Sequence, residues 1–164
     1  MKNLDKREGM NLIINNKLYL ILIAFLVNGC HLVSKNGDEY FKLELSKNPK
    51  VNSKIYGEFE YSSQLDTLHL GDKDYRSIRL YLGIFKREHT IQELKTVKLD
   101  TFVPLNDNEK KIPFYLEFKE KGSFIIDGYV EDIVFLNNYY KDGKTRILSN
   151  EAKVKGSVQV IDEK

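Results

Sequence analysis

Apolar and polar residues alternate with a period of two along four stretches of the sequence. The apolar positions are Phe41, Leu43 and Leu45; Ile55, Phe59 and Tyr61; Ile78, Leu80, Leu82 and Ile84; and Ile112, Phe114, Leu116 and Phe118. Successive side chains of a strand point to opposite faces, so each stretch predicts a strand with one buried and one solvated face. This is the pattern of antiparallel sheets.

Three further segments extend the pattern. A weaker strand is indicated by Val97, Leu99 and Phe102, and a closing strand by Val154, Val158 and Val160. The segment from Phe124 to Leu136 is longer and changes phase, because Ile133 and Phe135 fall on the parity opposite to Val130. We expect a β-bulge near Glu131-Asp132 that returns the later apolar side chains to the core.

Turn and cap signals lie between these segments. Gly122 and Asp142-Gly143 indicate hairpin turns. Thr90 and Glu93 have capping-box spacing, which predicts a short helical turn in a crossover. Seven or eight short strands separated by such signals predict an all-β fold, a single antiparallel β-sandwich of immunoglobulin-like kind. A small β-barrel is the alternative.

The N-terminal region carries an apolar run, Leu18 to Val27, that follows Lys17 and leads into Asn28-Gly29-Cys30. As a helix, such a run spans about 15 Å, against a bilayer core of roughly 30 Å, so it fits a signal peptide rather than a permanent span. Cys30 is the only cysteine of the chain. Asp5 and Glu8 are unusual before a signal core, so the start is open between Met1 and Met10.

Val27-Asn28-Gly29-Cys30 resembles the lipobox of bacterial lipoproteins, where a small residue precedes the cysteine. The resemblance implies lipid transfer to the Cys30 thiol and cleavage after Gly29. It implies a signal helix and peptide over residues 1–29, followed by a lipidated tether, which we place over residues 30–37. The strand pattern, not the resemblance, places the sandwich domain over residues 38–164. A plain secretory signal is the alternative. Either way, we expect export to the periplasmic face or the cell surface.

The charge balance narrows the choice of partners. Of 26 basic and 24 acidic residues, residues 1–29 hold four and two, so 22 of each remain in the mature part. Nucleic-acid binding, which needs a clustered basic excess, is therefore not expected. With Cys30 lipidated, no cysteine is left for a disulfide, and the domain must rely on its apolar core. We expect the membrane and an envelope protein as partners, and no cofactor.

Candidate chemistry rests on three carboxylates. Asp127 and Glu131 share the parity of Tyr129 and should line one strand face, with Asp132 next to them. Such a row could act in hydrolysis, but it is also the ordinary pattern of a wet strand face. His31, His69 and His89 lack the spacing of zinc ligands, so no metal site is predicted.

Tyrosines are the other candidates, because Tyr56, Tyr81, Tyr115 and Tyr129 fall on outward positions of the predicted strands. Tyrosine is enriched at protein interfaces, so these residues would form a binding face if they gathered on one sheet.

These observations favour a membrane-anchored lipoprotein acting as a non-enzymatic binding or scaffolding module. One alternative is an envelope hydrolase that uses the carboxylates, and another is an inhibitor or immunity-type lipoprotein. A concave site with converging carboxylates would favour the hydrolase, and a flat tyrosine-rich sheet the binding module. A protruding loop such as Asn137–Lys144 would favour the inhibitor.

Overall fold

A computed structural model describes residues 31–36, 39–45, 49–106 and 110–161, so the signal region and Cys30 lie outside the described residues. The chain forms, in order, β1 (His31–Asn36), β2 (Glu39–Leu45), β3 (Lys54–Ser62), η1 (Gln64–Thr67), β4 (Tyr75–Phe85), α2 (Ile91–Leu94), β5 (Asp100–Phe102), β6 (Lys111–Glu117), β7 (Gly122–Leu136) and β8 (Arg146–Val160). In this described part, no helix has the length and apolar character needed to cross a membrane.

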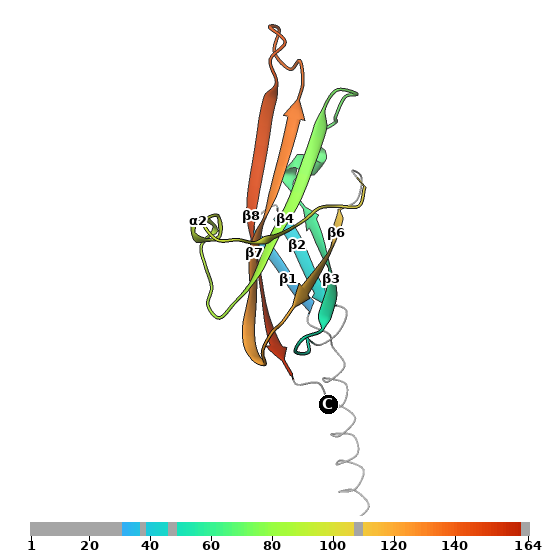
Figure 1. Cartoon of the computed structure of the whole chain (residues 1–164). Helices are drawn as coiled ribbons and strands as arrows, with labels where there is room; N and C mark the ends of the chain where they lie inside the picture. The colour runs from blue at the N-terminus through green and yellow to red at the C-terminus, as the bar shows by residue number, and fades with distance from the viewer. Residues whose placement is uncertain (1–30, 37–38, 46–48, 107–109, 162–164) are drawn as a thin grey trace, which may run out of the picture.

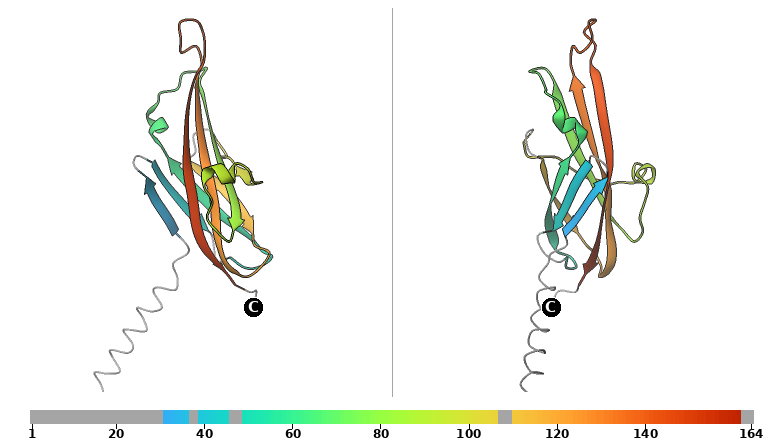
Figure 2. Two further views of the ribbon diagram at one scale, coloured as in Figure 1. Left: turned by 90° about the vertical axis from the view of Figure 1, so that its left-hand side faces the viewer. Right: turned by 180° about the vertical axis from the view of Figure 1, so that it is seen from behind.

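The strands form two four-stranded antiparallel sheets that face each other (Figures 1 and 2). Sheet I has the order β1-β2-β3-β6, and sheet II has the order β5-β4-β7-β8. The sheets do not close into a barrel, so the predicted β-sandwich is confirmed over the barrel alternative.

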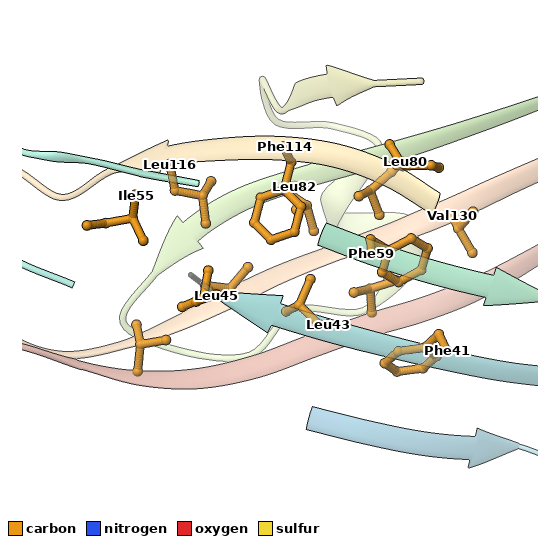
Figure 3. Close-up of a cluster of buried hydrophobic side chains, with 14 of the residues drawn as sticks. Phe41, Leu43, Leu45, Ile55, Phe59, Leu80, Leu82, Phe114, Leu116 and Val130 are labelled. Carbon is orange, nitrogen blue, oxygen red and sulfur yellow. The ribbon is translucent and has the colours of Figure 1, made fainter. Parts of the chain in front are cut away.

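The core lies between the sheets and is built from the alternating positions. Phe41, Leu43, Phe59, Phe114 and Leu82 point toward one another from four strands (Figure 3). Leu80, Leu82 and Val130 are completely buried. Complete burial of a side chain of this size stabilises the fold by about 1.5–3 kcal/mol. The period-two pattern therefore places the core correctly.

Strand β7 corrects one expectation, because it has no bulge. Its pairing with β4 continues unbroken from Phe85↔Ile125 to Tyr75↔Phe135, and its pairing with β8 is equally regular. Ile133 and Phe135 stay on the outer face, where the Phe135 ring stacks on Tyr75 at 4.4 Å. Asp132 stays on the inner face as an ion-pair partner of Arg76. Phe135 and Asp132 thus have partners on their own faces, so β7 needs no bulge to change the phase of its side chains.

The start of the sandwich also differs from expectation. Residues 30–37 were expected to be a tether, but His31–Asn36 form β1 and pair with β2 from His31↔Glu44 to Asn36↔Glu39. The backbone edge of β2 would otherwise be unpaired, and β1 provides its hydrogen bonds. At the other end of the sequence, β8 begins at Arg146, well before the predicted valines.

The two ends of the sandwich differ in what they carry. The first residue of β1 and the last residues of β8 lie at one end, which we call the basal end (Figure 1). There, Ile161 hydrogen-bonds with Pro49 and Val51 in the connection between β2 and β3. The opposite, distal end is formed by the β7–β8 hairpin and by the turn that precedes β4 (Figure 1).

Candidate functional site

The three candidate carboxylates do not form one row. Asp127 and Glu131 lie on the outer face of sheet II, as their parity predicts, whereas Asp132 lies on the inner face. Asp127 and Asp132 are both completely buried, while Glu131 is partly exposed. The expectation of a wet strand face therefore fails for Asp127, because another segment covers it.

That segment is the connection between β4 and β5, residues 86–99, which includes α2 and lies over sheet II (Figure 2). The backbone N–H of His89 donates to Asp127 Oδ2 at 2.8 Å, and His89 Nδ1 lies 3.4 Å from the same oxygen. Lys153 Nζ donates to Asp127 Oδ1. Asp127 is thus neutralised by a lysine and fastens the connection to the sheet.

Further contacts hold the connection in place. Thr90 and Glu93 form the predicted capping box, with the Glu93 side chain accepting from Thr90 N at 2.7 Å. Leu94 is completely buried. Two ion pairs tie the connection to β8, one between Lys95 and Glu151 at 2.5 Å and one between Glu88 and Lys155 at 2.7 Å. These contacts explain why the outer face of sheet II is covered at Asp127.

Two tyrosines lie on the same outer face. The rings of Tyr81 and Tyr129 stack at 4.7 Å, on neighbouring strands. The Tyr81 hydroxyl donates to Glu131 Oε2 at 3.4 Å. Burial, together with the nearby Tyr81 and Glu131, raises the pKa of Tyr129 above its ordinary 10.0. Tyr129 is only 8% exposed and is therefore a packing residue.

Asp132 belongs to a separate cluster on the inner face. The guanidinium of Arg76 donates to both of its carboxylate oxygens at 2.7 Å, and Ser63 Oγ donates to Oδ2 at 2.8 Å. Arg76 also donates to Asp66 at 2.6 Å. These contacts join β4 and β7 of sheet II to the end of β3, so the cluster links the two sheets.

The cluster shifts the titration of Asp66. Burial opposes ionisation of this carboxyl, but hydrogen bonds from Lys110 and Arg76 outweigh burial and lower its pKa from the ordinary 3.8. Asp66 also accepts a hydrogen bond from Ser63 N, which completes a capping box at η1. The Ser63…Asp66 spacing is the sequence signal that would have located this cluster.

Neither buried carboxylate has the geometry of a general acid or base, because such a group needs access to the proton that it transfers. Both oxygens of Asp127 and of Asp132 contact donors from the chain itself. Among the described residues, no three or more His, Cys, Asp or Glu side chains are grouped so as to hold a metal ion.

The four outward tyrosines form two pairs on opposite faces of the molecule. Tyr56 and Tyr115 are directly opposed on β3 and β6, on the outer face of sheet I, with ring centroids 6.4 Å apart. Both are exposed, whereas Tyr81 and Tyr129 lie on sheet II beside the β4–β5 connection. The structure therefore does not bring the four together into one binding face.

Exposed aromatic residues gather instead at the distal end. Three tyrosines and one isoleucine there are between 49% and 60% exposed: Tyr75, Tyr139, Tyr140 and Ile147. Phe135 is paired with Tyr75 on one side and with Ile147 on the other. We call these five residues the distal tip. No local sequence pattern predicts the tip, because its members come from three strand ends and a loop that meet only after folding.

Hydrogen bonds order the loops around the distal tip. Asn137 N donates to Asp74 Oδ1 at 2.7 Å, which ties the β7–β8 loop to the turn before β4. Thr145 Oγ1 donates to Asn137 Oδ1 at 2.8 Å, and Arg146 donates to the Tyr139 hydroxyl at 2.7 Å. Fixed aromatic side chains lose little conformational entropy on binding, which suits them to contact a partner.

Comparisons with known proteins give no further assignment: no protein-family model, curated protein or solved structure matches this chain.

Proposed function

We propose that this protein is an exported lipoprotein, anchored through lipid on Cys30, whose sandwich is a non-enzymatic binding module for an envelope protein. The anchor rests on the sequence alone: the apolar run Leu18–Val27, followed by Gly29 and the single cysteine. Two or more acyl chains attach a protein stably, at about 0.8 kcal/mol per buried CH₂.

One observation carries the binding role. The distal tip collects exposed aromatic side chains at the end of the sandwich opposite to the first residue of β1. A lipid on Cys30, the residue before β1, would hold the basal end at the membrane and present the tip to a partner. Tyrosine contributes large contact areas at interfaces, so a protein surface is the partner that fits the tip best.

The burial of the carboxylates supports a non-enzymatic role over the hydrolase alternative. Asp127 fastens the β4–β5 connection through His89 and Lys153, and Asp132 joins the sheets through Arg76. Both contacts give these two residues a structural role, which supports the binding module over a hydrolase that would use them.

A second candidate, an inhibitor or immunity-type lipoprotein, is favoured by the shape of the distal end. The β7–β8 hairpin reaches beyond sheet I, with its loop at the far end of the molecule (Figure 1). This loop contains the residues 137–144 that would insert into a partner's site under this hypothesis. The two candidates differ in whether the partner loses activity when bound.

Site-specific photo-crosslinking in cells tests the proposal. A photoreactive amino acid replaces Tyr140 at the distal tip, and in a matched control it replaces Tyr56, which is 59% exposed on sheet I. We expect a discrete crosslinked protein from position 140 and none from position 56. The adduct should weaken when Ile147→Ser is added, since this exposed residue contributes to the tip without entering the core.

Adducts from position 56 alone would contradict the assignment of the tip as the contact surface. Equal adducts from both positions would indicate nonspecific contact and would also count against it. If the crosslinked partner is an enzyme, its activity with and without this protein decides between the binding module and the inhibitor.

A further inference from the structure

We infer that the basal end of the sandwich rests directly on the anionic lipid headgroups of the membrane that holds Cys30. The contact is made by a basal surface, which we define as the lysines at this end: Lys50, Lys54, Lys86, Lys119 and Lys121. The inference rests on the proposed lipid anchor and adds to it a second, electrostatic attachment.

The chain between the anchor and the domain is very short. Cys30 directly precedes His31, the first residue of β1. One residue spans at most about 3.6 Å, so almost no linker separates the acylated cysteine from the sheet. The strand leaves the basal end, because His31 pairs with Glu44 next to the last residue of β2. A lipid on Cys30 therefore brings the basal loops to within reach of the headgroups.

The charge of the basal surface also favours contact with the membrane. Four of the five basal lysines come from three connections, and Lys54 is the first residue of β3. The connections lie together, since Lys86 pairs with Glu120 at 2.9 Å and Asn52 N donates to the Phe118 carbonyl oxygen at 2.8 Å. In the described segments 50–54, 85–86 and 117–122 of this end, there are five lysines and two acidic residues, Glu117 and Glu120. The mature sequence as a whole has equal numbers of basic and acidic residues, so the basal excess is a local feature. It is complementary to anionic phospholipid headgroups.

Aromatic side chains lie beside two of these lysines. Lys54 Nζ lies 4.8 Å from the centre of the exposed Tyr115 ring, and Lys86 Nζ lies 3.6 Å from the centre of the Phe124 ring. Ile161, which forms an isolated β-bridge with Lys50, is 49% exposed. Lysine and tyrosine side chains combine an apolar body with a polar end, which suits them to the boundary between headgroups and water.

A fluorescence-quenching experiment tests this contact on the acylated protein. Cys30 is the only cysteine and is blocked by its thioether, so one introduced cysteine takes a fluorophore at a single site. Lys121→Cys places the label at the basal end, and Lys141→Cys places it in the distal loop. The protein is reconstituted into vesicles of phosphatidylcholine alone or of equimolar phosphatidylcholine and phosphatidylglycerol, each with a headgroup-nitroxide lipid as quencher.

We expect quenching of the basal label in anionic vesicles to exceed that of the distal label by at least about twofold and to fall at high salt, because screening shortens the Debye length to about 3 Å at 1 M. The triple change Lys54→Gln, Lys86→Gln and Lys119→Gln should reduce basal quenching to the level in neutral vesicles. The matched distal change, Lys73→Gln, Lys141→Gln and Lys144→Gln, should leave basal quenching unaltered. Both triple variants carry the label at position 121.

Equal quenching at the two positions would overturn the inference, as would basal quenching that is insensitive to lipid charge, salt and the triple lysine change. The intact mass of the purified protein reports the anchor separately. An acylated chain without the basal contact would overturn this inference alone, whereas a chain without acyl mass would overturn the anchor and the inference together.

Discussion

Asp127 shows how a residue on the outside of a sheet can become structural. Its parity places it on the outer face, where the sequence pattern predicts either a solvated or a catalytic carboxylate. In the structure it is completely buried, because the β4–β5 connection covers it and supplies the His89 N–H as a donor. Residue patterns assign a face to a side chain, but they do not reveal which distant loop will cover that face.

The first prediction concerns the two outer carboxylates. Asp127→Asn should destabilise the protein by about 1–3 kcal/mol, because it removes the charge that pairs with Lys153 and weakens the bond from His89. Glu131→Gln, the matched control on the same face, should change stability by less than about 0.5 kcal/mol. Urea unfolding of both variants measures the difference. Equal stability of the two would show that Asp127 does not fasten the connection.

The second prediction concerns pH. Hydrogen bonds from Lys110 and Arg76 overcome burial and lower the pKa of Asp66 from 3.8, so folding favours its ionised form. Its contribution to stability is present above pH 3.8 and is lost as the pH falls from there through the lower folded pKa. Asp66→Asn should therefore flatten the acid side of the stability profile, measured by thermal unfolding at several pH values. Asp72→Asn, an exposed neighbour, should leave the profile unchanged.

At the scale of elements, the sequence predicted those features that depend on contacts between residues close together in the chain. The capping box at Thr90 and Glu93 forms as expected, because both partners lie within one turn. The continuity of β7 was missed, since it depends on Arg76 from β4 as the partner of Asp132. β1 was missed because its stability comes from backbone pairing with β2 rather than from an apolar pattern of its own.

The third prediction tests the close approach of β4 and β7. Gly128 is opposite Leu82, and a Cβ atom at this position would lie 1.9 Å from the carbonyl oxygen of Tyr81. Gly128→Ala must move one strand away from the other and should cost at least about 2 kcal/mol. Gly71→Ala, where the nearest atom is a side-chain oxygen of Asp74 at 3.3 Å, is the control. A loss of stability no larger than that of the control would contradict the tight strand contact.

At the scale of the whole molecule, the period-two pattern was sufficient to predict two packed antiparallel sheets and their core. The difference between the distal and basal ends of the molecule was not predictable in the same way. The distal tip combines Tyr75 with Phe135 and Ile147 from three different strands, and the basal surface combines lysines from separate connections. Both surfaces result from the register of distant strands, which no single stretch of sequence contains.

The proposed function uses this difference between the two ends, and the function depends above all on the lipid at Cys30. The most direct measurement compares incorporation of radiolabelled palmitate into the wild-type protein and into Cys30→Ser, expressed in the same bacterium. We expect labelling of the wild type and none of the variant, because the thiol is the acyl acceptor and serine cannot replace it. Equal labelling of both proteins, or labelling of neither, would contradict the account of this chain as a lipoprotein anchored through Cys30.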